Sequence, residues 1–314
     1  EYEGLKINDS RKKILEDLRK KDFLAKQSKI KHNVNVHDKC GTEIEFLKTP
    51  QWYVKVLDKK HELIKAADKI NWHPAHMKTR YVHWVENLNW DWCISRQRHF
   101  GVSFPVWYEK DTGNIIVASE SQLPVDPEKD KPKGYRGNAK NLVAEDDVLD
   151  TWATSSVTPQ IILDWKGKSN YGVGFKNYPC SLRPQAHDII RTWAFYTIVK
   201  GLYHHKKVPW KDISISGFVV DPDGKKLSKS KGNYVPPHDI MEKYGADSLR
   251  LWSATAKLGE DLRYKEEDIK TAQKTITKLW NASRFVLMHL EDYDSKKGCD
   301  SDELELIDKW LLIK

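Results

Sequence analysis

The sequence predicts an α/β domain followed by a helical one. Segments typical of strands alternate with segments typical of helices up to residue 220, and only helical patterns follow beyond it. Of the 314 residues, 39% are hydrophobic and 31% are charged, which is typical of a folded globular chain. At about 100–200 residues per domain, this length accommodates two or three domains.

The first 108 residues predict a surface helix, a turn and an aromatic-rich region. Within the charged stretch 1–31, Ile14, Leu15 and Leu18 share one helical face after Asp9-Ser10, a candidate N-cap. Residues 32–48 predict a turn or knuckle. The density of aromatic residues in 49–108 indicates a packed core or a stacking surface.

The middle of the chain predicts a loop, two strands and a helix. Residues 121–140 combine Pro, Gly and charge, so we expect a long loop. Residues 178–200 predict a strand, a turn at Arg183-Pro184-Gln185 and a helix with apolar residues at helical spacing. Residues 213–220 predict a strand that ends in the turn Asp221-Pro222-Asp223-Gly224.

The last part predicts a long helix of a bundle. Its apolar face comprises Ile269, Ala272, Ile276, Leu279, Val286 and Leu290.

Composition and charge exclude several classes of protein. No apolar run approaches the roughly 20 residues that cross a bilayer, and the N-terminus lacks the pattern of a secretory signal. The four cysteines form no CxxC pair, which favours a reducing compartment. A net charge of +8 suits a polyanion such as a nucleic acid or a nucleotide. We therefore expect a cytoplasmic protein without membrane association, and the absence of an initial Met suggests a piece of a longer chain.

The segment 224–233 carries the clearest chemical signal. It places four lysines within seven residues, interleaved with Ser228 and Ser230 and flanked by glycines. Lysines supply point charges and hydroxyls donate to phosphate oxygens, so such a loop can hold a polyphosphate while its charge shifts. On charge alone, a solvated lysine loop is the favoured interpretation.

The order of residues in this segment is more specific than its charge. Lys226-Leu227-Ser228-Lys229-Ser230 resembles the KMSKS signature of class I aminoacyl-tRNA synthetases, with Leu227 in place of Met. Five further blocks resemble valyl-tRNA synthetases in the right order: 51–54 (QWYV), 92–97 (WCISRQ), 147–152 (DVLDTW), 183–193 (RPQAHDIIRTW) and 278–285 (KLWNASRF). The likeness covers essentially the whole chain, and six blocks in order are far more specific than any one.

The resemblance implies activation of valine by ATP with Mg²⁺, followed by transfer to tRNA(Val). Lys226 and Lys229 would stabilise the charge on the departing pyrophosphate, and Asp188 would accept hydrogen bonds from the ribose hydroxyls. The family usually has glycine where this chain has Ala186, which puts close adenosine packing in doubt. The nucleotide would be contacted by Ala186, His187, Asp188, Gly224, Ser228, Lys229 and Ser230.

The resemblance also assigns residues to the amino acid and to tRNA. Trp152 and Trp193 match the aromatic walls of the valine pocket, although a buried tryptophan is often only part of a core. We expect four polar residues to line the path of the tRNA acceptor end, where each could instead be an ordinary surface group: Lys78, Arg80, Arg96 and Gln97.

The family organisation implies four regions. Residues 1–48 would be the trailing edge of the editing insertion and a knuckle-like turn. Residues 49–235 would be the C-terminal half of the Rossmann-like catalytic domain, 236–268 a stem-contact segment, and 269–314 the start of the helical anticodon-binding domain. The family's HIGH motif does not occur in this sequence. We therefore expect the chain to need the missing N-terminal half of the synthetase as its partner.

A metal site and two alternative functions complete the predictions. His32, His37 and Cys40 are zinc-ligand types, but a closed site needs four ligands, and Glu109 and Thr112 stand where the family often has a second CxxC. We therefore expect no zinc. The alternatives are a synthetase-like RNA-binding module without catalysis and one chain of a split synthetase.

Overall fold

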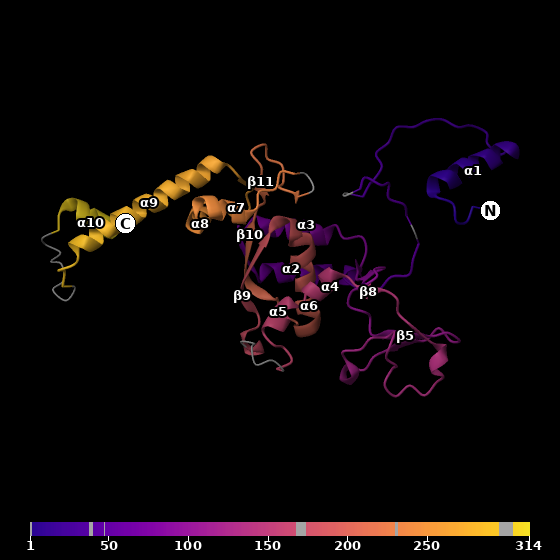
Figure 1. Ribbon diagram of the computed structural model, residues 1–314. Coiled ribbons are helices and arrows are strands. Elements are labelled where there is room, and N and C mark those ends of the chain that lie inside the picture. Colours follow the sequence, from indigo (N-terminus) through magenta and orange to yellow (C-terminus); the bar gives the residue numbers. More distant parts are fainter. Residues whose placement is uncertain (1, 38–39, 47, 168–173, 230–231, 295–303) are drawn as a thin grey trace. The chain divides into compact units, whose positions relative to one another are not determined.

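The computed structural model describes residues 2–37, 40–46, 48–167, 174–229, 232–294 and 304–314 (Figure 1). The chain divides into two compact units, Glu1–Pro50 and Gln51–Lys314. Among the described residues, no helix is both long enough and apolar enough to span a membrane.

Helix α1 (Ile7–Lys20) lies in the first unit, as the sequence predicted. The expected start after Asp9-Ser10 is wrong, because the Ser10 amide already donates to the Lys6 carbonyl at 2.8 Å. Asp9 instead places a carboxylate in the first turn, where its negative charge interacts favourably with the positive end of the helix dipole and stabilises the helix. Val36 and Glu43 form an antiparallel bridge that closes the expected turn.

A parallel three-stranded sheet organises the second unit, in the order β2 (Asn71–His73), β10 (Trp210–Ser216), β9 (Cys180–Ala186). The fold is therefore α/β, as expected. Three helices contribute apolar side chains to the same core: α2 (Lys60–Asp68), α3 (Met77–Glu86) and α6 (Phe195–His205). Tyr81, Phe195 and Ile213 are at most 1% exposed in this core.

The expected turn at Arg183-Pro184-Gln185 is wrong, because β9 continues through all three residues. Arg183 pairs with Ile213, Pro184 with Ser214 and Gln185 with Ile215 of β10. β9 is the last strand in the sheet order among the described residues, and an edge strand tolerates the missing N–H of proline.

The expected helix after β9 forms in three steps. A 3-10 turn, η5 (His187–Ile189), leads into a single π-helical turn, η6 (Ile190–Ala194), and then into α6. Ile190, Ala194 and Ile198 are buried, so the predicted apolar face is confirmed. π-helical turns within helices are frequent at functional sites.

The predicted strand 213–220 is divided at Gly217. β10 ends at Ser216, and the short β11 (Val219–Val220) pairs in parallel with β12 (Leu262–Arg263). The expectation of helices alone beyond residue 220 is therefore wrong. The predicted turn is present, with Gly224 at φ +83° and its amide bonded to the Asp221 carbonyl at 2.9 Å.

Short antiparallel strands precede and follow the loop 121–140 in the sequence. β1 (Tyr53–Val54) pairs with β3 (Trp92–Cys93), and β4 (Ser95–Arg96) pairs with β8 (Val148–Leu149). A second three-stranded sheet has the order β6 (Ile115–Val117), β5 (Val106–Glu109), β7 (Leu142–Ala144), and the predicted loop lies between β6 and β7. The short helices α4 (Thr151–Ser155) and α5 (Thr158–Ile162) follow β8.

The C-terminal part is mainly helical: α7 (Pro237–Tyr244), α8 (Ala246–Ala254), α9 (Glu266–His289) and α10 (Leu306–Ile313). Ile269 and Ala272 of α9 are buried against α7 and α8. The rest of the predicted apolar face is not covered, because Leu279 is 63% and Val286 is 52% exposed. The predicted long helix is confirmed, and the second half of its apolar face is exposed.

Candidate functional site

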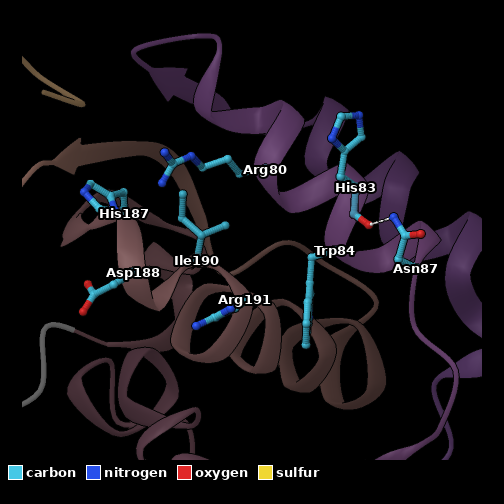
Figure 2. Close-up of a pocket in the computed structure, with 8 residues that line it drawn as sticks. All are labelled: Arg80, His83, Trp84, Asn87, His187, Asp188, Ile190 and Arg191. Atoms are coloured by element: carbon cyan, nitrogen blue, oxygen red, sulfur yellow. Dashed lines mark hydrogen bonds between the residues drawn. The ribbon is translucent and has the colours of Figure 1, made fainter. Parts of the chain in front are cut away.

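A cavity of about 590 Å³, here called the α3–η6 cavity, lies where the turn after β9 faces helix α3 (Figure 2). β9 ends at Ala186, so His187 and Asp188 lie at the carboxyl end of the sheet, the usual place for ligands in open α/β sheets. In Figure 2, Arg80 extends from α3 toward His187. The lining residues are Arg80, His83, Trp84, Asn87, His187, Asp188, Ile190 and Arg191.

His187 is held from two sides by residues of other segments. Its Nε2 lies 3.2 Å from Asp261 Oδ1, and its ring packs edge-on against Phe218 with the ring centroids 4.5 Å apart. The Phe218 amide donates to Asp261 Oδ1 at 2.8 Å. This amide, and secondarily His187, holds the pKa of Asp261 below its usual range. The imidazole is therefore oriented before any ligand enters.

Lys226 and Asp188 join the two most informative sequence blocks. Lys226 Nζ lies 3.5 Å from Asp188 Oδ2 and 3.9 Å from the centroid of the Phe218 ring. The side chains of Lys226 and Asp188 are 58% and 38% exposed. An exposed ion pair of this kind contributes little stability, so a ligand can replace either partner at small cost.

Asn233 fixes the base of the lysine loop. Its Nδ2 donates to Asp221 Oδ2 at 2.9 Å, and its Oδ1 accepts from the Ser228 amide at 2.9 Å. The Asn233 amide and the Lys225 backbone N–H hold the pKa of Asp221 below its ordinary value. The loop is thus tied to the turn that ends β11.

The remaining nucleotide candidates are placed as follows. Lys229 Nζ lies 5.3 Å from the centroid of the Tyr234 ring. Ala186 has φ −86° and ψ 162°, an extended conformation that any residue adopts, so the backbone does not require glycine there. Ser230 lies outside the described residues.

Trp193 is tightly fixed on η6. Its indole N–H donates to the Ser155 carbonyl at 3.3 Å, and the Arg183 guanidinium carbon lies 2.9 Å from the ring centroid. Burial lowers the pKa of Arg183 to about 10. Trp152 lies in α4, the helix that Ser155 ends, so both predicted wall residues belong to elements that contact each other.

Of the four acceptor-end candidates, only Arg80 lines the α3–η6 cavity. Lys78 Nζ lies 2.5 Å from Asp68 Oδ1 of α2. The other two connect blocks 92–97 and 147–152: Arg96 Nη2 lies 3.2 Å from Asp150 Oδ2, and Gln97 Nε2 donates to both carboxylate oxygens of Asp147, at 2.9 and 2.8 Å.

The metal candidates do not form a complete ligand set. His37 Nδ1 lies 3.1 Å from Cys40 Sγ, whereas His32 Nδ1 contacts the neighbouring Asn33 carbonyl at 3.1 Å. Within the described part of the chain, no three His, Cys, Asp or Glu side chains are grouped as metal ligands. Hydrogen bonds with Thr42, and then His37, lower the pKa of Cys40 to about 7.

Phe218 and Asp261 were not predicted as site residues. Phe218 lies in the stretch assigned to a strand, and Asp261 precedes β12, whose pairing with β11 has no local signature. To assign Phe218 and Asp261 to the site, one would have needed to know that the 259–263 segment approaches residue 217. Gly217 is the local signal for this approach, since glycine within a strand pattern indicates close approach of another backbone.

Residues 5–265 match the family described as "tRNA synthetases class I (I, L, M and V)". The chain belongs to this family. It is also a homologue of valine–tRNA ligases, so the resemblance inferred from the six sequence blocks is confirmed.

Curated class I synthetases of the valine type are similar over nearly the entire chain. The valine–tRNA ligase of Rickettsia conorii is 46% identical over 332 residues, with 99% of this chain and 40% of that protein covered. The valine–tRNA ligase of Picrophilus torridus is 46% identical over 312 residues, with the same two coverages. The chain thus spans about 40% of the length of these relatives.

Solved class I synthetases share the fold at low sequence identity. Mycobacterium tuberculosis methionyl-tRNA synthetase, in complex with methionyl-adenylate, has a TM-score of 0.60 at 21% identity. The match covers 89% of this chain and 48% of the methionyl-tRNA synthetase chain. The leucyl-tRNA synthetase of Agrobacterium radiobacter K84, in a ternary complex with tRNA and LeuAMS, has a TM-score of 0.50 at 19% identity, covering 66% and 31%. These likenesses support the α/β assignment.

Proposed function

We propose that this chain carries the lysine-loop half of the ATP site of a valine–tRNA ligase, which activates valine and transfers it to tRNA(Val). The observation that supports it best is the 3.5 Å contact between Lys226 Nζ and Asp188 Oδ2. It joins the KLSKS segment to the end of β9, beside the α3–η6 cavity. The class I family uses ATP, and we propose that the nucleotide enters as its Mg²⁺ complex.

Nucleotide binding in this proposal exchanges one ion pair for two new interactions. The ribose hydroxyls of ATP donate to the Asp188 carboxylate, and Lys226 moves from that carboxylate to the phosphates. His187 contacts the nucleotide in the orientation that Asp261 and Phe218 impose. Because the Lys226–Asp188 pair is exposed, the exchange costs little.

Adenylate formation then follows from the charges. A carboxylate oxygen of valine attacks the α-phosphorus, a new O–P bond forms, and the bond to the bridging oxygen breaks to release pyrophosphate. Lys226 and Lys229 stabilise the charge that develops on the leaving group, with Gly224, Ser228 and Ser230 shaping the loop. Trp152 and Trp193 bound the valine side chain.

Transfer to tRNA completes the proposed reaction. A hydroxyl of the terminal ribose attacks the valyl carbonyl, and AMP leaves. Arg80 contacts the acceptor end from α3, while Lys78, Arg96 and Gln97 lie along its path. The regions 1–48, 49–235, 236–268 and 269–314 keep the roles that the family organisation implies, and the N-terminal half of the synthetase is the protein partner.

Titration of the chain, combined with the N-terminal half of the synthetase that we propose as its partner, with a non-hydrolysable valyl-adenylate analogue tests the proposal. Tryptophan fluorescence follows the binding. We expect saturable binding, at least tenfold weaker for the isoleucyl analogue, because one methylene is worth about 10–200-fold. Asp188→Asn should weaken binding about tenfold through loss of charged hydrogen bonds. Lys129→Met, an 80% exposed lysine in the 121–140 loop, is the matched control.

A lack of binding by a folded chain is the outcome that contradicts the proposed function. A chain that circular dichroism shows to be folded, but that in the presence of the N-terminal half binds the analogue no better than the Asp188→Asn variant does, contradicts the proposal. RNA binding that persists in such a chain would favour the alternative of an RNA-binding module without catalysis.

A further inference from the structure

Arg183, in the middle of β9, carries a positive charge that the neighbouring side chains compensate poorly. Its Nε and Nη2 atoms are buried and have no hydrogen-bond partner within the described ranges. Burial lowers the pKa of this guanidinium to about 10. A buried charge without hydrogen bonds costs free energy, so the presence of an arginine at this position calls for an explanation.

The flat face of the guanidinium makes the contacts that its N–H groups do not. Its Cζ atom lies 2.9 Å from the centroid of the Trp193 ring and 5.7 Å from that of Trp210. At 2.9 Å the carbon can only lie over the face of the Trp193 indole, where a cation is attracted by the ring. Trp210 is 1% exposed and belongs to β10, the strand that pairs with β9. The cation therefore rests on the sheet and holds Trp193 from there.

Trp193 has one further fixed contact, at its edge. Its indole N–H donates to the Ser155 carbonyl at 3.3 Å, at the end of the helix α4 that carries Trp152. One face of the ring is covered by Arg183, and the side chain as a whole remains partly exposed. Two contacts thus set the position of Trp193 relative to Trp152: the hydrogen bond to Ser155 and the stack on Arg183.

We propose that Arg183 is a positioning residue of the valine pocket, and that by stacking on Trp193 it sets the largest side chain the pocket accepts. This rests on the proposed function, in which Trp152 and Trp193 bound the valine side chain. A rigid apolar pocket rejects one additional methylene by about 10–200-fold. A wall that can retreat loses this discrimination. Arg183 acts here only through Trp193 and touches no substrate atom.

The decisive variant is Arg183→Met, studied together with the N-terminal half of the synthetase. Methionine fills a similar space, but it is uncharged and flexible, so it cannot hold the indole in one place. The preference for the valyl-adenylate analogue over the isoleucyl analogue should fall about tenfold, through tighter binding of the isoleucyl analogue. Affinity for the valyl analogue should stay nearly unchanged, because the smaller side chain still fits.

Stability separates this role from a merely structural one. Replacing a poorly compensated buried charge by an apolar side chain is often neutral or stabilising, so Arg183→Met should unfold at no lower urea concentration than the unmodified chain. Arg183→Lys is the second variant. It keeps the charge but lacks the plane that covers the indole, and it should lose the preference as well. Lys211→Met, which removes an exposed cation from the neighbouring strand β10, is the matched control and should keep the full preference.

Two measurements show whether Arg183 acts through Trp193. Exchange of the Trp193 indole N–H, followed by NMR, should be faster in Arg183→Met, because the ring that donates to Ser155 is no longer held. Adding Arg183→Met to Trp193→Phe should cause no further loss of preference, because both changes affect the same wall.

The outcomes distinguish this inference from the proposed function. Full preference for the valyl analogue in a folded Arg183→Met or Arg183→Lys variant, with normal binding by the unmodified complex, overturns the inference alone. Unchanged exchange of the Trp193 indole N–H, or additive effects of the Arg183 and Trp193 substitutions, also overturns it. Absence of analogue binding by the unmodified complex contradicts the proposed function, and the inference with it.

Discussion

Gly217→Ala is the sharpest structural test of how the site is assembled. A Cβ atom at this position would lie 2.0 Å from the Glu260 carbonyl oxygen and 2.6 Å from the Asp261 nitrogen. Both contacts are with backbone, so no side-chain rotation relieves them. The 260–261 segment must therefore move, and it carries the carboxylate that bonds the Phe218 amide and His187.

The expected cost combines two effects. Overpacking of a close contact costs about 1–3 kcal/mol. A hydrogen bond to a charged acceptor, such as that from the Phe218 amide to Asp261, contributes about 1.5–3 kcal/mol, and partial exposure lowers this figure. Together they predict a local destabilisation of about 3 kcal/mol, which corresponds to roughly 100-fold faster amide exchange.

Hydrogen exchange at the Phe218 and Leu262 amides measures this directly, since Leu262 N donates to the Phe218 carbonyl at 2.8 Å. Gly113→Ala is the control, because its Cβ meets nothing within 4 Å and its φ of +69° adds only local strain. Exchange at Phe218 in Gly217→Ala no faster than in Gly113→Ala would refute the reasoning. Affinity for the valyl-adenylate analogue should fall together with protection.

Three further predictions follow from single contacts. Arg96→Ala should lower stability by about 3 kcal/mol in urea unfolding, because Asp150, with a side chain only 7% exposed, loses its cation. Burial lowers the pKa of His204 to about 4, so between pH 6.5 and 4 the unfolded chain binds more protons than the folded chain does. The free energy of unfolding should therefore fall as the pH is lowered through that window, and it should fall less in His204→Gln. Iodoacetamide at pH 7 should alkylate Cys40 well before Cys180 by mass spectrometry, since hydrogen bonds lower the pKa of the former and burial raises that of the latter.

Local sequence patterns located the elements whose stabilising contacts are themselves local. The i, i+3, i+4 spacing of apolar residues identified α1, the helix after His187 and α9. The turn ending in Gly224 was also predicted, because its positive φ favours glycine. The same patterns misplaced the start of α1, where Asp9-Ser10 resembles a cap but lies inside the first turn.

Features that depend on contacts between segments distant in sequence could not be predicted from local sequence patterns. Pro184 indicated a turn, but among the described residues its strand lies at a sheet edge, where a missing donor is tolerated. The parallel pairing of Val219 with Leu262 joins residues far apart in sequence, so neither Phe218 nor Asp261 could be assigned to the site. The second half of α9 shows the converse, since its apolar spacing exists without burial in the described chain.

The pairing of β11 with β12 has a thermodynamic consequence. Tyr264 N donates to the Val220 carbonyl at 2.8 Å, and only Lys265 separates Tyr264 from the first residue of α9. Val220 is in turn bridged to Lys226 of the lysine loop. We therefore expect a displacement at the start of α9 to shift the equilibrium of the loop. Because linkage is reciprocal, a ligand that changes the loop should then change, by the same factor, the affinity of whatever binds and moves the long helix.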